Sequence, residues 1–300
     1  MSAPGLLVVG NVNVDLVMGE VAGWPAVGTE IILPNSEMRP GGSAGNTALA
    51  LSGLGMAHTL VATVGDDAIG QWLMASFDKA HSVWAVLPGD TTITVGIVHK
   101  GGDRAFLTSQ GHLHRSRTHD FGDRIPRAPV GGGYAILSGG YLMPTVEAGT
   151  VEMIKLLKSL GWRVAIDPGW PPKGWSERTR KLATHWYEQA DIVLLNLDEV
   201  KGFTGEDDVA VAVSAMRAEF LDGHVLVVKR GAAGASAYRD GASYHVRAPS
   251  VEVVDTVGAG DTFNAAFLAH LSEGGDISAA LTRGVMVASR AISTFPRRYR

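Results

Sequence analysis

The sequence contains no cysteine, which excludes disulfide bonds, thiolate nucleophiles and cysteine-based zinc sites. It has no long basic stripe, and its net charge of -4 gives no surface suited to a nucleic-acid backbone. The uncharged stretch 46–65 is broken by glycine, serine, histidine and threonine, so it is not typical of a membrane span. There is no basic-then-apolar signal pattern at the N-terminus. We therefore expect a cytoplasmic protein without nucleic-acid or membrane partners.

The composition indicates a globular protein, because 46% of the 300 residues are hydrophobic and 19% are charged. No proline-, serine- or charge-rich linker divides the chain, so we expect a single domain over residues 1–300. Short apolar, β-rich runs predict buried strands. They lie at Leu6–Val9, Leu60–Val64, Tyr134–Leu137, Arg163–Ile166, Ile192–Leu195 and Val225–Val228.

Helical periodicity fills most intervals between these runs. The predicted helices are Ala44–Leu54, Ile69–Ala80, Val146–Leu160, Glu177–Gln189, Val209–Leu221, Ala259–Ser272 and Ile277–Ile292. Such alternation predicts a doubly wound, mainly parallel sheet flanked by helices. Two stretches differ, because 30–33 and 92–99 alternate apolar with polar or small residues, which is typical of strands with one solvated face. We expect these to form a small lid.

Polar residues gather where the predicted strands end, at the edge that forms the ligand crevice of an open parallel sheet. They are Asn11, Asn13, Asp15, Asp167, Asn196, Glu199 and Lys229 to Gly231. Each could instead cap a helix or make a turn. Because they gather at one edge of the predicted sheet, a ligand-binding site is favoured over a set of unrelated caps and turns.

The segment DTVGAGDTFNAAFLAHL, from Asp255 to Leu271, is a glycine-rich turn that leads into a helix. Backbone N–H groups of Gly258, Ala259 and Gly260 at a helix start would favour an anion. Asp261 in the first turn would place a carboxylate where it can take a proton from an attacking hydroxyl. The alternative is an ordinary tight turn whose Asp261 interacts with the helix dipole.

A second glycine-rich turn, RPGGSAGNTALALSGLG, also leads into a helix. Gly41 and Gly42 would let the backbone approach a small ligand, and Asn46 can pair with vicinal hydroxyls. An ordinary helix start is the alternative. Three histidines, at 112, 114 and 119, lie in a polar segment that we interpret as a solvated loop rather than a metal site.

Both glycine-rich segments resemble the signature motifs of the ribokinase-like, or PfkB, carbohydrate kinase family. The first reads GGSAGNTALALSGLGMAHTLVATVG and the second DTVGAGDTFNAAFL. The resemblance continues in GNVNVDL near the start, VGDDAIG at 64–70, NLDE at 196–199 and VKRGAAGA from 228. It implies an α/β, ribokinase-like domain over 1–300, with a small β-sheet lid whose strands lie approximately within 12–38 and 91–109.

The resemblance also implies roles for individual residues. Asp261 would be the catalytic base, with the anion hole formed by Gly258, Ala259 and Gly260. The positions matched to sugar binding are Asn13, Asp15, Gly41, Gly42 and Asn46. The positions matched to nucleotide binding are Asn196, Lys229, Gly231, Gly234 and Asp255. Glu199 matches the residue associated with the metal ion.

The implied activity is that of an ATP-dependent carbohydrate kinase, a phosphotransferase acting on an alcohol group of a small sugar, with ATP and Mg²⁺. A monovalent cation such as K⁺ is left open, because the C-terminal stretch RGVMVASRAISTFPRRYR has Val285 near the position where relatives often carry an asparagine. A nucleoside kinase and a non-catalytic sugar-binding regulator are the alternatives. An exposed lid edge would suit a homodimer.

Overall fold

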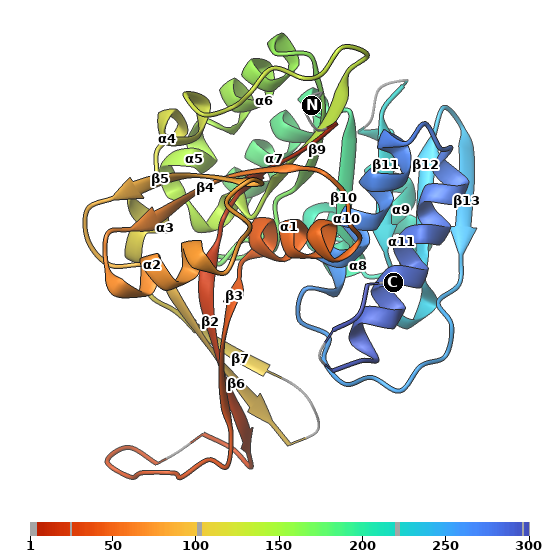
Figure 1. Cartoon of the computed structure of the whole chain (residues 1–300). Helices are drawn as coiled ribbons and strands as arrows, with labels where there is room; N and C mark the ends of the chain where they lie inside the picture. Colours follow the sequence, from red (N-terminus) through yellow and green to blue (C-terminus); the bar gives the residue numbers. More distant parts are fainter. Residues whose placement is uncertain (1–4, 25, 101–103, 220–222, 296, 300) are drawn as a thin grey trace.

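The computed structural model describes residues 5–24, 26–100, 104–219, 223–295 and 297–299. Within these ranges the chain forms a nine-stranded sheet, in the order β13-β12-β11-β10-β9-β8-β1-β4-β5, and a four-stranded sheet, in the order β3-β2-β6-β7. Figure 1 shows the larger sheet enclosed by helices and the small sheet extending away from this body.

The large sheet is parallel except at one edge. Its parallel strands are β1 (Leu6–Gly10), β4 (Thr59–Gly65), β5 (Ser82–Leu87), β8 (Gly133–Ser138), β9 (Trp162–Asp167), β10 (Ile192–Asn196) and β11 (Val225–Lys229). The antiparallel strands β12 (Ala235–Arg239) and β13 (Ala242–Val246) follow β11 as a meander. These short runs are apolar because helices cover both faces of the sheet.

Each face of the sheet has its own hydrophobic core, and successive residues of one strand alternate between them. In β1, Leu7 and Val9 belong to one core, whereas Leu6 and Val8 belong to the other. The helices of the second core are α1 (Ser43–Gly53), α2 (Ala68–Ala75), α10 (Ala259–Ser272) and α11 (Ile277–Ile292). The opposite face carries α3 (Gly111–Arg115), α4 (Thr118–Gly122), α5 (Pro144–Ala148), α6 (Thr150–Ser159), α7 (Glu177–Gln189), α8 (Leu197–Thr204) and α9 (Val209–Ala218).

The strand order reverses at β1. From β1 the chain builds the sheet through β4 and β5 on one side, and through β8, β9, β10 and β11 on the other. In an open parallel sheet such a switch point opens a crevice at the carboxyl ends of the strands. The helices α1 and α10 pack together beside β1 at this place. The topology therefore brings two glycine-rich helix starts, whose N-cap residues Gly42 and Gly258 are 216 residues apart in the chain, to one edge.

The small sheet consists of β2 (Asn13–Val21), β3 (Ser36–Gly41), β6 (Ile93–His99) and β7 (Arg104–Thr108). Strand β2 pairs with β3 antiparallel and with β6 parallel, and β6 pairs with β7 antiparallel. Because β2 follows β1 after two residues and β3 leads directly into α1, the inner end of this sheet lies beside the end of β1 and the start of α1 (Figure 1).

The six predicted buried strands are confirmed to within one or two residues, and the predicted helices at 177–189, 259–272 and 277–292 are confirmed at both ends. The predicted strand at 30–33 is wrong: these residues form no strand, and β3 begins at Ser36. Pro34 explains the difference, because it lacks an N–H group and restricts the residue before it.

Three further predictions need correction. The helix predicted over 146–160 is two helices, which meet at Gly149, where a Cβ would come within 2.3 Å of the Thr118 side chain. The helix predicted over 69–80 ends at Ala75. His112 is fully buried, and its ring bonds the N–H of Thr92 and the carbonyl of Val12, so the solvated-loop interpretation was wrong for this residue. The last residues of the helix predicted over 209–221 lie outside the described ranges.

No helix in the described part of the chain has both the length and the apolar character needed to cross a membrane.

Candidate active site

The start of α10 is a left-handed glycine turn that exposes backbone donors. Gly258 is the N-cap residue with φ of 72°, a conformation that favours glycine. The N–H groups of Gly258 and Gly260 have no hydrogen-bond partner among the described residues, whereas the N–H of Ala259 donates to the carbonyl of Thr256 at 3.1 Å. The prediction of three free amides is therefore wrong for Ala259. Two amides remain at the positive end of a helix of 14 residues.

Asp261 lies in the first turn of α10 and keeps part of its surface exposed. Its Oδ2 accepts a hydrogen bond of 3.0 Å from Nδ2 of Asn46 in α1. Burial and the nearby Asp167 carboxylate raise the pKa of Asp261 to about 7, although Lys229 and Asn46 act in the opposite direction. A carboxyl group with this pKa can accept a proton near neutral pH.

A buried polar cluster of Asp167, Lys229 and Asn264 lies beside this turn. Lys229, at the end of β11, donates to Oδ2 of Asp167 at 2.6 Å and to Oδ1 of Asn264 at 3.3 Å. Asn264 also donates to Asp167, at the end of β9, at 2.5 Å. Asp167 is the last residue of β9, and Lys229 is the last residue of β11. Their side chains meet because these two strands lie on either side of β10 in the sheet, which the sequence alone does not show. Asn264 was not predicted, although it lies one turn after Asp261 on the same helix.

Asn196 and Glu199 form a reciprocal cap at the start of α8. The Asn196 side chain accepts from the N–H of Glu199, and the Glu199 carboxylate accepts from the N–H of Asn196, both at 2.8 Å. Burial and the Asp167 carboxylate raise the pKa of Glu199 to about 7, and Lys229 opposes this shift. The cap fixes one carboxylate oxygen of Glu199 beside the cluster at the strand ends.

Gly231 and Gly234 shape the turn between β11 and β12, where both have positive φ. A Cβ on Gly234 would lie 1.9 Å from the carbonyl oxygen of Val246, so only glycine fits there. The turn follows directly after Lys229, whose Nζ lies 3.3 Å from where a Cβ on Gly260 would be. This turn and the Gly260 side of the α10 start therefore border one another through Lys229.

The small sheet contributes Asn13 and Asp15 to the opposite side of the crevice. Nδ2 of Asn13 donates to Oδ1 of Asp15 at 2.8 Å and to the hydroxyl of Thr94 at 3.2 Å. Burial raises the pKa of Asp15, and the Asn13 hydrogen bond partly offsets this. Gly41 faces the same carboxylate, since a Cβ there would lie 2.2 Å from Oδ2 of Asp15. The absence of a side chain at Gly41 therefore leaves room for Asp15.

Gly42 joins the small sheet to α1. It is the N-cap residue of this helix with φ of 83°, and a Cβ there would lie 2.5 Å from the carbonyl oxygen of Asn11 and 2.7 Å from Oδ1 of Asn13. This close approach places Asn13 against the first turn of α1, in which Asn46 reaches Asp261. The side chains of Asn13, Asn46 and Asp261 thus occupy adjoining positions.

Asp255 lies at the start of the glycine-rich turn and is held by two arginines that were not predicted. Arg39 Nη1 and Arg297 Nη2 each donate to Oδ2 of Asp255 at 2.8 Å, and the N–H of Val257 donates to Oδ1 at 3.0 Å. Burial alone would raise the pKa of Asp255, but these donors outweigh it and hold the pKa at about 2. Asp255 therefore shapes the turn as an ionised group.

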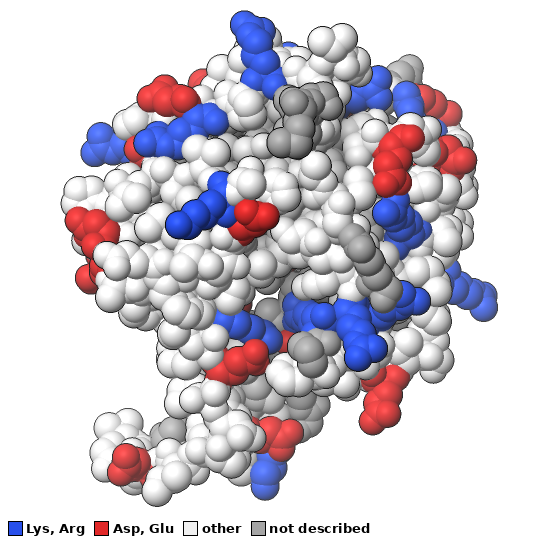
Figure 2. Space-filling model, viewed as in Figure 1, with Lys and Arg blue, Asp and Glu red and all other residues white. Residues whose placement is uncertain are grey.

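The predicted site residues thus fall into three neighbouring groups. The first group, on the small sheet and α1, comprises Asn13, Asp15, Gly41, Gly42 and Asn46. The second, at the start of α10, comprises Asp255, Gly258, Ala259, Gly260 and Asp261. The third, at the ends of β10 and β11, comprises Asn196, Glu199, Lys229, Gly231 and Gly234. Figure 2 shows Lys and Arg atoms gathered around a hollow between the small sheet and the main body.

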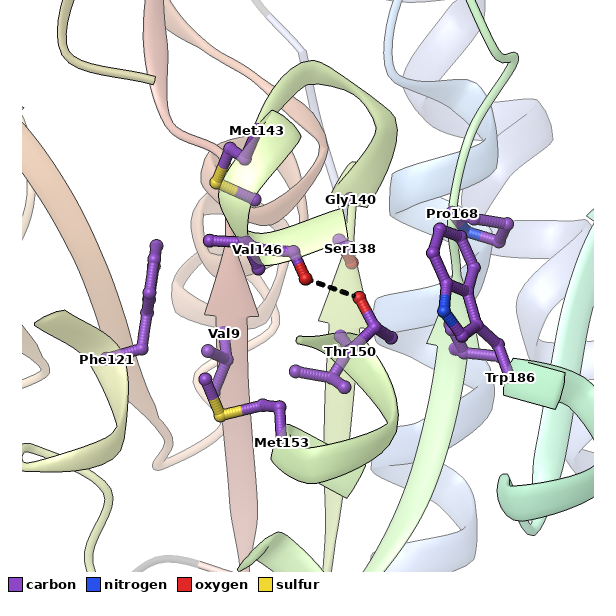
Figure 3. A pocket seen from close by; sticks show the side chains of 13 residues that line it. Val9, Phe121, Ser138, Gly140, Met143, Val146, Thr150, Met153, Pro168 and Trp186 are labelled. Atoms are coloured by element: carbon purple, nitrogen blue, oxygen red, sulfur yellow. Dashed lines mark hydrogen bonds between the residues drawn. The ribbon is translucent and has the colours of Figure 1, made fainter. Parts of the chain in front are cut away.

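A separate small cavity lies inside the protein and is a poor candidate for the ligand site. It has room for about 20 Å³, and its lining is mostly apolar, with Val9, Phe121, Met153 and Trp186 among the residues. In Figure 3 these side chains point into the space, and the hydroxyl of Thr150, the first residue of α6, donates to the carbonyl of Val146 in α5. This volume suits at most one water molecule.

The cluster at the strand ends fits a hydrated divalent cation better than a directly ligated one. Among the residues that the structure describes, no three His, Asp or Glu side chains are arranged to hold a metal ion. Asp167 raises the pKa of both Glu199 and Asp261, so negative charge is in excess there. Magnesium commonly keeps several waters and binds through one or two carboxylates plus phosphate oxygens, which is compatible with Glu199.

Comparison with known proteins identifies the family. The model of the pfkB family carbohydrate kinases matches residues 4–295. The chain is 26% identical to the fructokinase of Salmonella typhimurium over 81% of this chain and 82% of that protein. It is 28% identical to the ATP-dependent ribose-1-phosphate kinase of Halopiger xanaduensis over 92% of this chain and 88% of that protein.

Among solved structures, the adenosine kinase from Sinorhizobium meliloti superposes with a TM-score of 0.81 at 22% identity and covers 99% of this chain and 96% of that one. This likeness shows the same fold, an α/β ribokinase fold with a large, mostly parallel sheet and a small separate sheet. Together with the family match over nearly the whole chain, it confirms the resemblance seen in the sequence: the protein belongs to the pfkB family of carbohydrate kinases.

Proposed function

We propose that this kinase transfers the γ-phosphoryl group of ATP to a hydroxyl of a small sugar, and that Asp261 is the base that accepts the hydroxyl proton. One observation carries the proposal: a carboxylate with a pKa of about 7 lies within one turn of two backbone amides at a helix start that have no hydrogen-bond partner among the described residues. The amides would stabilise negative charge on the transferring group, and the carboxylate would deprotonate its acceptor.

The acceptor would bind between the small sheet and α1. Asn13 and Asn46 each offer an amide to a hydroxyl, and Asp15 offers a carboxylate. Gly41 and Gly42 would let the sugar approach the backbone closely. The small sheet would act as a lid over residues approximately within 12–38 and 91–109, and would exclude water, which competes with the sugar as an acceptor.

The nucleotide would lie on the other side of the α10 start. Lys229 would neutralise phosphate charge, while Gly231 and Gly234 would let the β11–β12 turn border the nucleotide, and Asn196 would fix the turn at the start of α8. Mg²⁺ would bind through water to Glu199 and would neutralise charge on the phosphates. ATP is the donor of the related ATP-dependent ribose-1-phosphate kinase from Halopiger xanaduensis, which supports ATP as the donor here.

We also propose a single domain, a cytoplasmic location and a homodimer formed through the small sheet. The small sheet and the segment that precedes β3 expose several large apolar side chains. They are Ile31, Ile32, Met38, Phe106 and Leu107. A monomeric mass in light scattering would remove the dimer proposal.

The function is tested by measuring ATP consumption with magnesium across a panel of sugars, sugar phosphates, sugar acids and nucleosides. Asp261→Ala should lower acceptor-dependent turnover by about 10²- to 10⁴-fold. Asp276→Ala is the matched control, because Asp276 caps α11 as an ordinary helix-start carboxylate. Equal turnover in wild type and Asp261→Ala would refute the assignment of Asp261 as the base. Sugar binding without turnover in either would favour the non-catalytic regulator, and turnover with nucleosides alone would favour the nucleoside kinase.

A further inference from the structure

Two arginines share one carboxylate beside the glycine-rich turn that precedes α10. Arg39, on β3, and Arg297, near the end of the chain, both donate to the same oxygen of Asp255, while its other oxygen accepts from the backbone. Nη2 of Arg39 is buried and has no hydrogen-bond partner among the described residues. A guanidinium group has five N–H donors. The pair therefore has donor capacity that Asp255 does not use.

The position of this pair is on the acceptor side of the α10 start. A Cβ on Gly258 would lie 3.0 Å from the Asn46 side chain and 3.1 Å from Nη1 of Arg297. The corresponding position on Gly260 faces Lys229 instead. The two glycines thus separate a side that holds Asn46 and Arg297 from a side that leads to the β11–β12 turn.

Arg39 belongs to the same side. It is the cross-strand partner of Asp15 in the β2–β3 ladder, and residues directly opposite one another project to the same face of a sheet. That face carries the residues proposed to bind sugar hydroxyls. Arg39 therefore lies between Asp15 and the glycine-rich turn that Asp255 begins.

The nearest charged groups around the pair are two carboxylates. The two guanidinium groups face the ionised Asp255 and also Asp15, and burial raises the pKa of Asp15, so Asp15 holds its negative charge less firmly than Asp255 does. Glu37 approaches Arg39 only to 3.7 Å, with 48% of its side chain exposed, so solvent screens this pair. An incoming anion would meet planar donors suited to two oxygens at once.

We propose that Arg39 and Arg297 bind an anionic group of the acceptor, so that the preferred acceptor is a sugar that already carries a phosphate ester or a carboxylate. The inference rests on the proposed function and narrows its substrate class. The anionic group would lie between β3 and the Gly258 side of the turn, and it would position the sugar so that another hydroxyl faces Asp261.

The test compares matched acceptors: a neutral sugar, its monophosphate and its acid, each assayed with Mg-ATP. The wild type should prefer at least one anionic member by about tenfold to 100-fold in kcat/KM, the range expected for one or two charge-assisted hydrogen bonds. Arg39→Gln and Arg297→Gln should bring that ratio towards one. Arg298→Gln is the control and should leave it unchanged, because its side chain is exposed. The preferred member identifies the group as phosphate or carboxylate.

A wild type that prefers the neutral sugar would overturn the inference. Equal losses for neutral and anionic acceptors in Arg39→Gln would also overturn it, because the arginines would then only brace Asp255. Calorimetric binding to Asp261→Asn without nucleotide separates this result from failure of the kinase proposal. Tighter binding of the anionic sugar, lost in Arg39→Gln and Arg297→Gln, supports the subsite even if turnover is absent, and equal binding of both sugars refutes it.

Discussion

Replacing Lys229 with methionine removes the ammonium group that lies among the carboxylates of Asp167, Glu199 and Asp261. The Lys229–Asp167 pair is short, at 2.6 Å, and the two side chains are only 12% and 8% exposed. Removing one partner of such a pair leaves a buried charge unpaired, which costs about 3–5 kcal/mol in the free energy of unfolding. For 300 residues, an unfolding entropy of about 2.1 cal/mol/K per residue converts this to a fall in Tm of about 5–8 °C.

The assay is urea unfolding followed by tryptophan fluorescence, with Tm from calorimetry. The companion variant Asp167→Asn completes a double-mutant cycle, which separates the interaction energy of the Lys229–Asp167 pair from the effects of each substitution on other neighbours. Lys229→Met with Asp167→Asn should be more stable than Lys229→Met alone, because the unpaired charge is gone, with a coupling energy of about 1–3 kcal/mol. A loss below about 1 kcal/mol in Lys229→Met, or strict additivity in the double variant, would refute the reasoning.

The same variant tests the electrostatics of the base. Lys229 lowers the pKa of Asp261, so its removal should move the midpoint of the pH profile of kcat/KM to higher pH. A midpoint that stays in place or moves to lower pH would contradict the assigned coupling.

Three other predictions follow from the site. In wild type, kcat/KM should fall about tenfold for each pH unit below about 7 and level off above it, because Asp261 must be ionised and its pKa is raised to about 7; a flat profile between about pH 5.5 and 8.5 would contradict this. Since that pKa lies above its unfolded value, the ionised carboxylate destabilises the fold increasingly as pH rises from about 4 to 7. At pH 8, Asp261→Asn should therefore have a free energy of unfolding about 1–2 kcal/mol higher than wild type, after allowing for the partial exposure of Asp261, and should unfold at a higher urea concentration. An unchanged urea midpoint would contradict the destabilisation by the buried carboxylate. Gly41→Ala should raise the KM for the acceptor more than that for ATP, because its methyl group would displace Asp15; equal rises would place Asp15 outside the acceptor site.

Much of the main body could be predicted because its signals are local. Helices α7 and α11 are preceded by the N-cap residues Ser176 and Asp276 and contain periodic apolar residues. Periodicity alone did not find strand β2, which the family resemblance placed only within the broad range 12–38, because β2 is half-buried and takes its partners from two other segments. Pairing of this kind depends on tertiary contacts more than on the propensity of the segment itself.

For the site, too, the parts with a local sequence signal could be predicted, whereas the contacts between distant segments could not. The glycine-rich motif located Asp261, but the bond from Asn46 spans 215 residues of sequence, so the motif alone could not place the two side by side. Arg39 and Arg297 carry no local signal, since an arginine in a strand or a tail is usually solvated. Their convergence on Asp255 appears only once β3 and the chain end meet at the start of α10.

The central claim is that the Asp261 carboxylate deprotonates a sugar hydroxyl for phosphoryl transfer. The most direct measurement is product formation by mass spectrometry, with Mg-ATP and the best acceptor, in wild type and Asp261→Asn at pH 8. We predict one phosphoryl group on the acceptor per ATP consumed in wild type, and product formation about 10²- to 10⁴-fold slower in a folded Asp261→Asn. Equal rates in the two proteins, or ATP cleavage without a phosphorylated acceptor, would contradict the account.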